Sequence, residues 1–197
     1  CRILMLSAHN LLNPKDGSPE AVPGKDMVLG LYYMTIIRDG AKGEGKFFKD
    51  FEEALAAYQS DVINLQAKIK VRLECPTDSS IKKIIETSIG RLILNEVMPQ
   101  DLGFVDRTNP EHACEPEINF IVAKKQVGQI VNRCYRKYGN SKTAVILDEL
   151  KRLGFKNATS TGVSIALEDI VIPEEKYEII TIAEEEVESI KRAYRRG

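Results

Sequence analysis

The sequence predicts an α+β fold in which a small antiparallel sheet with helices is followed by an all-helical half. Two patterns predict this fold. Apolar and basic residues alternate from 67 to 73, as in a half-buried strand. Apolar residues recur at three- and four-residue steps from 127 to 153 and again from 180 to 194, as in amphipathic helices. The second half is therefore predicted to contain a helical hairpin, a loop and a long helix.

The composition is that of a globular protein, since 43% of the 197 residues are hydrophobic and 29% are charged. A formal net charge of -1 excludes a basic field over the whole surface, so any contact with nucleic acid must be local or made through partners. The cysteines form no CxxC pair, and no apolar stretch has the length of a membrane span. We expect a cytoplasmic protein with reduced thiols at Cys1, Cys75, Cys114 and Cys134.

The first segment, CRILMLSAHNLL, begins in mid-pattern without a helix-start signal, which predicts a fragment of a longer chain. Turn residues follow at 13–17. Asp26 is then expected to cap a short helix from Met27 to Met34. Because that helix is apolar nearly all round, we expect it to be buried.

Residues 40–46, GAKGEGK, have the glycine spacing of a phosphate-binding P-loop. The match fails at Phe47, where Ser or Thr should hold magnesium, and the sequence that follows is typical of a strand instead of a helix. A glycine-rich connection between a helix and a strand is the favoured interpretation.

The sheet is predicted from a strand at 67–73 and a partner strand at 81–86, preceded by a helix from Asp50 to Gln59 with an acidic first turn. Two interpretations stay open for the basic residues of these strands. They form either a local basic patch or an ordinary solvated sheet face, which alternation alone produces. The residues are Lys68, Lys70, Arg72, Lys82 and Lys83.

A short apolar helix beginning near Ser88 is expected to stop at Pro99. The polar stretch 100–117 then predicts a long surface connection, and we place the domain boundary at its end, giving domains 1–117 and 118–197. His112 and Cys114 lie within this stretch, but a metal site there would need two further ligands that no nearby spacing supplies.

The predicted hairpin consists of two helices separated by Gly139, the second capped by Asn140 or Ser141 and stopped by Gly154. A connection this short places the two helices antiparallel. Cys134 lies on the apolar face of the first helix, so a packing role is favoured over chemistry.

The stretch Gly154–Pro173 interrupts the helical pattern. Its small polar residues and Gly162 predict a loop, and the alternation from Val163 to Glu168 predicts a strand-like segment. A long helix begins at Pro173. It has a coiled-coil-like apolar seam at Ile180, Ala183, Val187, Ile190 and Tyr194, opposite an acidic face at Glu178, Glu184, Glu185 and Glu188.

Several of these stretches resemble the beta-prime subunit of bacterial RNA polymerase. The first is Met5–Thr35, MLSAHNLLNPKDGSPEAVPGKDMVLGLYYMT, and the second is GFKNATSTGVSIALEDIVIPEEK at Gly154–Lys176, which is similar to the F-loop of that subunit. Shorter matches lie at Gln66–Arg72 and at Ser88–Arg91, where the family has a Thr-x-Gly-Arg motif.

The resemblance covers essentially the whole chain. It implies a pore region at 1–117 and a funnel region at 118–197, with the F-loop at 154–173. In that family these regions wall the secondary channel through which nucleotides enter, and they support the bridge helix and trigger loop. The implied enzyme is a DNA-directed RNA polymerase, a nucleotidyltransferase. The fragment alone is expected to be inactive, with no catalytic or metal-binding residue of its own, and magnesium and zinc are expected elsewhere in the full-length subunit.

The resemblance also implies which residues lie near substrate and the active centre. Two of them depart from the family pattern: Lys25 stands where the family has Gln, and Ser160 stands where many members have an Arg that faces the triphosphate. A serine hydroxyl lacks the charged bidentate fork of arginine, so shape and packing are the expected contribution there. The implied residues are Lys25, Asp26, Lys156, Asn157, Thr159, Ser160, Thr161 and Gly162.

The implied partners are the polymerase beta, alpha, omega and sigma subunits, DNA template and RNA through the assembled enzyme, and regulatory factors that enter the secondary channel; no membrane is implied. The alternative is a stand-alone, non-catalytic interaction module that uses the acidic C-terminal helix. A P-loop nucleotidase is a third hypothesis, which the failed motif at 40–46 disfavours.

Overall fold

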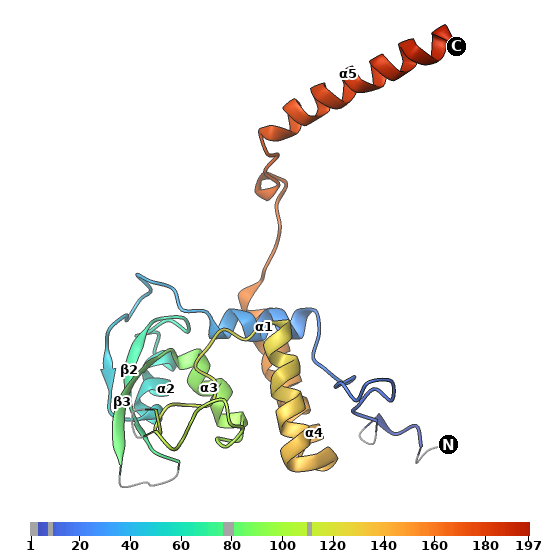
Figure 1. Ribbon diagram of the computed structural model, residues 1–197. Coiled ribbons are helices and arrows are strands. Elements are labelled where there is room, and N and C mark those ends of the chain that lie inside the picture. The colour runs from blue at the N-terminus through green and yellow to red at the C-terminus, as the bar shows by residue number, and fades with distance from the viewer. Residues whose placement is uncertain (1–3, 8–9, 77–80, 110–111) are drawn as a thin grey trace. The chain divides into compact units, whose positions relative to one another are not determined.

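The computed structural model describes residues 4–7, 10–76, 81–109 and 112–197 (Figure 1). Within these residues the chain divides into two compact units, Cys1–Gly162 and Val163–Gly197. The first unit holds the sheet and most of the helices, and the second holds one long helix. Together they have the predicted α+β composition with a helical second half.

The sheet has three strands in the order β1 (Phe47–Phe48), β2 (Ile69–Glu74) and β3 (Lys82–Thr87). β2 and β3 pair antiparallel over their whole length, which confirms the predicted strand pair. The short β1 adds a parallel neighbour to β2 that periodicity did not predict. Side chains of β2 alternate as expected, since Ile69 and Val71 are buried while Lys70 between them is exposed.

Two short helices complete this part of the first unit. α2 (Phe51–Gln59) begins at Asp50, whose carboxylate accepts a hydrogen bond from the Glu53 backbone N–H. α3 (Ile89–Val97) begins at Ser88, whose hydroxyl accepts from the Arg91 N–H. α2 contacts β2 and α3, and Figure 1 shows both helices beside the sheet. Both helices were predicted from the sequence.

α1 (Asp26–Thr35) and α4 (Lys124–Thr161) make the most extensive contact between helices. The prediction that α1 is buried all round is only half right. Leu31 and Met34 are fully buried, whereas Leu29 and Tyr32 are about 40% exposed. α1 therefore buries one face against α4 and α3 and presents the other outward.

The backbone of α4 reverses at Gly139, which has φ 71° and ψ -171°, a conformation essentially confined to glycine. Both ends of the resulting pair of helical arms lie against α1. The Val122 N–H donates to the Thr35 hydroxyl at 2.9 Å, and the Asn157 amide nitrogen lies 3.5 Å from the Met34 sulfur. The predicted antiparallel hairpin is confirmed (Figure 1).

One hydrophobic core joins the sheet, α1, α2, α3 and both arms of α4. Cys134 is fully buried within it, in line with a packing role. The core also spans the predicted domain boundary at 117/118, since the Ile118 N–H donates to the Asn95 side chain of α3 at 3.0 Å. The division into domains 1–117 and 118–197 stays a prediction, and the hydrophobic core contains residues from both sides of this boundary.

The segment 100–117 is not the plain surface connection that its polar composition predicts. Glu117 is 1% exposed, and its carboxylate accepts hydrogen bonds from the backbone N–H groups of Gly103, Phe104 and Val105 at 2.7 to 3.3 Å. Arg107 completes the arrangement, with Nη2 3.5 Å from the Glu117 carboxylate. The segment thus folds around a buried charge, because a carboxylate with several N–H donors and a cation tolerates burial.

The second unit contains the 3-10 helix η2 (Leu167–Asp169) and α5 (Glu175–Arg196). Every residue of this unit is exposed, apolar side chains included. The helix is supported by acidic residues in its first turn and by Arg195 and Arg196 in its last turn, both favourable toward the helix dipole. In the described part of the chain, no helix combines the length and apolar content that crossing a membrane requires.

Candidate functional site

The two groups of residues implied to lie near the active centre are carried by α1 and α4, and these two helices cross in close contact. Gly30 and Gly154 lie where the helices touch. A Cβ added at Gly30 would come 1.9 Å from the Gly154 carbonyl oxygen, and one added at Gly154 would come 2.7 Å from the Met27 carbonyl oxygen. Only glycine permits this approach of the two backbones, so these positions fix where the second arm of α4 crosses α1.

Lys25 and Asp26 form the start of α1 on one side of this crossing. The predicted cap by Asp26 is wrong, because Asp26 is already the first helical residue and the cap position falls on Lys25. Lys25 has φ 50°, a positive value that is uncommon for a residue with a side chain, and no side chain caps the helix. Both side chains are exposed, so a cation and a carboxylate project from adjacent positions.

The predicted loop at the start of Gly154–Pro173 is a helix in the structure, because α4 continues to Thr161. The polar side chains hydrogen-bond to the preceding turn. The Ser160 hydroxyl donates to the Lys156 carbonyl at 3.0 Å, and that of Thr161 donates to the Asn157 carbonyl at 2.6 Å. These bonds satisfy the hydroxyl groups inside the helix, so residues that favour turns elsewhere do not end it here.

The helix ends at Gly162, which has φ 57° and ψ 43°, the left-handed conformation typical of a helix C-terminus. Residues 163–166 follow without regular structure and without a strand partner, which corrects the predicted strand-like segment. Asp169 then accepts a hydrogen bond from the Ala166 N–H at 2.8 Å, closing η2. A lone alternating segment forms no strand when no edge is available to pair with it.

The eight implied site residues therefore occupy two places on one scaffold. Lys25 and Asp26 lie at the start of α1, directly before Met27, whose carbonyl touches Gly154. The other six occupy the last two turns of α4 and its end. Of these, Lys156, Thr159, Ser160 and Gly162 are exposed, while Asn157 and Thr161 are half-buried.

Asn157 is the residue of this set that is tied to the scaffold. Its amide nitrogen donates to the Leu153 carbonyl at 2.8 Å and lies against Met34 of α1. The exposed end of α4 is thus held by the contact of Asn157 with α1. The Ser160 and Thr161 hydroxyl groups are bonded to backbone carbonyls, so the exposed charges of the site are those of Lys25, Asp26 and Lys156.

Chemistry that needs metal ligands is not built into the described residues, where no group of three or more His, Cys, Asp or Glu side chains could hold an ion. His112 is exposed and pairs with Glu115 at 2.8 Å, whereas Cys114 is buried. These residues do not fit a metal centre.

Residues of the glycine-rich stretch 40–46 form hydrogen bonds and an ion pair within the protein. The Glu44 carboxylate accepts from the Gly40 N–H at 2.5 Å, and the Lys42 ammonium pairs with Asp61 at 2.7 Å. The stretch leads into β1, as predicted, and not into a helix. A helix N-terminus facing the loop is what a P-loop requires, so the interpretation as a connection holds.

The basic face of the sheet is largely neutralised. Glu86 lies 2.9 Å from the Lys68 ammonium and 3.5 Å from that of Lys70, and Lys82 pairs with Glu74 at 2.6 Å. The pKa of Glu86 is lowered, chiefly by the Lys68 hydrogen bond and charge. Of the two open interpretations, these pairs favour the solvated sheet face.

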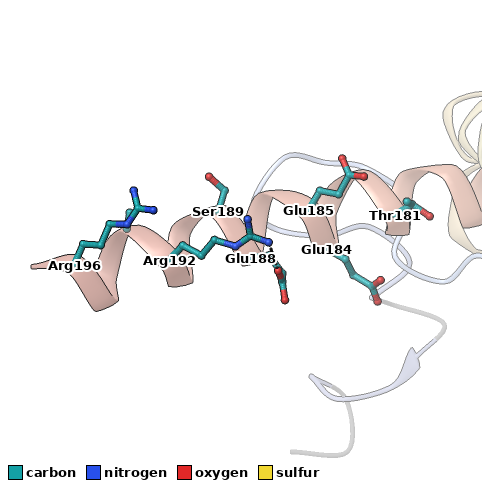
Figure 2. A pocket seen from close by; sticks show the side chains of 8 residues that line it. Thr181, Glu184, Glu185, Glu188, Ser189, Arg192 and Arg196 are labelled. Carbon is teal, nitrogen blue, oxygen red and sulfur yellow. Dashed lines mark hydrogen bonds and ion pairs between the residues drawn. The ribbon is translucent and has the colours of Figure 1, made fainter.

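Figure 2 shows three glutamates of α5, Glu184, Glu185 and Glu188, followed toward the C-terminus by Arg192 and Arg196. A hollow of about 770 Å³ is lined by residues that all belong to this helix, so it is an open helix face and not an enclosed site. The Arg192 guanidinium pairs with Glu188 at 2.8 Å, while Glu184 and Glu185 project from the same helix. The apolar seam from Ile180 to Tyr194 is exposed as well.

Sequence reasoning missed two buried groups that organise this scaffold. Arg91 donates from Nε to the Thr35 carbonyl at 2.9 Å and from Nη1 to the Asn119 carbonyl at 2.8 Å, joining α3 to the end of α1. Glu117 holds the segment 100–117. The Ser-Ile-Gly-Arg string was a usable signal for Arg91, whereas a glutamate in a polar stretch gave none for Glu117.

Comparison with known proteins identifies the class. The sequence model of the family described as RNA polymerase Rpb1, domain 3 matches residues 10–170. The chain belongs to this family of RNA polymerase largest-subunit domains.

The relatives are more specific. The chain is 50% identical, over all 197 residues, to the DNA-directed RNA polymerase subunit beta' of Clostridium botulinum strain Okra and to that of Acetivibrio thermocellus. The same identity and coverage hold for the subunit beta' of Caldicellulosiruptor saccharolyticus. The chain spans 17% of the length of each of these relatives. The family resemblance inferred from the sequence is confirmed.

Proposed function

We propose that this chain is a section of the wall of the secondary channel in a bacterial RNA polymerase, where it supports the bridge helix and trigger loop during RNA synthesis. The observation that carries the proposal is 50% identity to beta' subunits over every residue of the chain. The close crossing of α1 and α4 supports it, since the two implied groups of active-centre residues lie on these two helices.

In this proposal the end of α4 acts by position. The Gly30–Gly154 contact and the Asn157 hydrogen bond hold the last turns of α4 on α1. A rigidly held end of α4 can limit the movement of a neighbouring mobile element. The motions of such elements set the turnover rate of many enzymes. Ser160 places no charge at the position where many family members have Arg, so the support is steric.

The active-centre-proximal residues in this proposal are those named above from the sequence, and none of them is catalytic. The reaction would use magnesium held elsewhere in the full-length subunit, with zinc also bound elsewhere. The chain would assemble in the cytoplasm with the beta, alpha, omega and sigma subunits, and would meet template, RNA and secondary-channel factors only in the complete enzyme.

Deleting residues 157–162 in the assembled polymerase tests the role of the α4 end. We expect slower nucleotide addition with promoter and template binding nearly unchanged, because the deletion removes support near the active centre and not the DNA contacts. A matched control replaces exposed Thr159 and Ser160 with Ala, which keeps the helix and should leave most of the rate. Equal loss of DNA binding and elongation in the deletion would contradict the proposal.

The isolated chain is expected to incorporate no nucleotide, and template-directed activity of the purified chain would contradict that expectation.

The exposed seam of α5 favours one second candidate, a protein-interaction module. A pull-down separates the two candidates. Recovery of polymerase beta subunit supports the polymerase role, whereas recovery of unrelated basic proteins alone supports the stand-alone module.

A further inference from the structure

Two cysteines that are far apart in the sequence meet in a small core of their own, apart from the main core. Cys75 follows the end of β2, and Cys114 belongs to the segment 100–117. They share this core with Ile85 of β3, and each cysteine is 2% exposed. Both are thiols in this structure.

The two thiols are in direct contact. Burial, followed by the hydrogen bond and the charge of Cys75, raises the pKa of the Cys114 thiol, while Lys83 and Arg107 oppose the shift. A disulfide needs a sulfur–sulfur distance of about 2.05 Å, which is shorter than any contact between two thiols, so closing the bond requires the two sulfurs to move together. One cysteine lies just past a strand end and the other in a turn, where the backbone can shift this far more readily than inside a helix.

A route for a small oxidant exists at Cys114. This residue lines a surface cavity of about 210 Å³ whose walls include Pro76, Pro116 and Leu73. One water occupies about 30 Å³ of liquid volume, so hydrogen peroxide fits. Cys75 is not among the lining residues, so Cys114 is the cysteine of the pair that borders the cavity.

We propose that Cys75 and Cys114 are a thiol–disulfide modification site that takes hydroperoxides as oxidants. The Cys114 sulfur attacks one peroxide oxygen, the O–O bond breaks, and the Cys114 thiol proton passes to the departing oxygen, so that a sulfenic acid and one water form. The Cys75 sulfur then attacks the sulfenic sulfur and displaces hydroxide, which leaves as water with the Cys75 proton. Two thiols and one hydrogen peroxide thus give one disulfide and two waters.

The disulfide would fasten the segment 100–117 to the end of β2. That segment is otherwise held by Glu117 and Arg107 and by contacts of its first residues with α4, among them an ion pair of 2.8 Å between Lys137 and Asp101. A covalent bond across a loop this long restricts the chain more than any of those contacts. Oxidation of the two cysteines would therefore make the segment 100–117 more rigid.

The test treats the assembled polymerase containing this sequence with hydrogen peroxide under native conditions, blocks remaining thiols after denaturation, and maps peptides by mass spectrometry. We expect a linked peptide pair joining Cys75 to Cys114, lighter by two hydrogen atoms, with both thiols lost in equal amounts and recovered by dithiothreitol. Loss of the two thiols at different rates, or oxidation of Cys114 to sulfinic acid without a link, would overturn the proposal.

Variants sharpen the result. In Cys75→Ser, Cys114 should stop at the sulfenic acid and be trapped by dimedone. In Cys114→Ser, Cys75 should stay reduced. The matched control is Cys134→Ser, which alters a buried thiol in the main core and should leave the link intact. Mapping of the wild-type enzyme needs no substitution, so the test holds even where a variant fails to fold.

Discussion

The buried side chain of Arg91 links α3 to the end of α1 and to Asn119. It is 8% exposed, and its guanidinium bonds the carbonyl groups of Thr35 and Asn119 together with the Asn119 side chain. Burial lowers its pKa from the ordinary value, but a guanidinium stays charged throughout the accessible pH range. The charge is thus stabilised by carbonyl dipoles of Thr35 and Asn119 instead of by a carboxylate.

Replacing Arg91 with Met should cost about 2–4 kcal/mol of unfolding free energy, because buried carbonyl groups lose their donor. Urea denaturation of the 197-residue chain measures it. The matched control is Arg152→Met, whose partner Glu149 is one turn away on an exposed helix face, and its cost should stay below about 0.5 kcal/mol. Equal effects of the two substitutions would show that Arg91 is not a structural link.

Cys134 gives the chain a stability that depends on pH. Burial, with a smaller contribution from Asp101, raises the pKa of its thiol to about 11. An unfolded thiol titrates near 8.5. Between these values the folded state holds a proton that the unfolded state has released, so stability falls as pH rises.

We expect the stability advantage of wild type over Cys134→Ala to shrink by about 2 kcal/mol between about pH 8 and about pH 10.5. Urea titrations of both proteins at each pH measure the difference, and the comparison cancels other groups that titrate in this range. A constant difference would mean that the thiol is not buried as described.

At the scale of elements, the crossing of α1 and α4 sets the geometry of the candidate site. Gly30→Ala should destabilise the chain by about 1–3 kcal/mol, because the new methyl group meets the Gly154 carbonyl at a distance no real contact shows. The intrinsic gain of Ala over Gly in a helix, about 1 kcal/mol, opposes this but does not offset it.

Gly128→Ala is the matched control. Gly128 also lies within a helix, but a Cβ there meets nothing within 4 Å. The substitution should therefore stabilise the chain by about 0.5–1 kcal/mol. Thermal unfolding of both variants measures the opposite signs, and two changes of the same sign would contradict a close helix contact at Gly30.

The elements also show what the sequence could and could not predict. The start of α2 could be predicted from the local sequence, because the Asp50 carboxylate accepts a hydrogen bond from the backbone N–H of Glu53, three residues further along. The parallel pairing of Phe47 with Lys70 was missed, because no local pattern specifies a partner so far along the chain. The helix through Ser160 was missed because propensity disfavours it, and packing at Gly154 overrides propensity.

The candidate site was predictable in part. The residues near Lys25 and near Ser160 were predicted through family resemblance, and they lie on the two helices that cross at Gly30 and Gly154. The roles of Asn157 and Gly30 were not found, since a hydrogen bond to the preceding turn and a backbone contact leave no motif. The buried state of Glu117 was hidden because its donors are backbone N–H groups, which every sequence has.

At the scale of the whole molecule, the two compact units differ in how they are stabilised. The unit Cys1–Gly162 has a continuous core, whereas Val163–Gly197 buries none of its residues. Removing residues 163–197 should therefore leave the urea midpoint of the first unit nearly unchanged. Cutting at the predicted boundary after residue 117 should abolish cooperative unfolding, because α1 loses the hairpin that covers it.

Circular dichroism during urea titration measures both truncations. A stable, cooperative 1–117 chain would contradict a main core shared across residue 117, and a large loss of stability in 1–162 would show that α5 contributes to the first unit.

The paired glycines at 30 and 154 also bear on how this family can change over time. A side chain acquired at either position collides with the backbone of the other helix, so no compensating change of a single neighbouring side chain relieves it. Relatives that part the two helices must do so by several substitutions at once. Positions 30 and 154 should accordingly be inherited as a pair, with both glycines kept or both lost together.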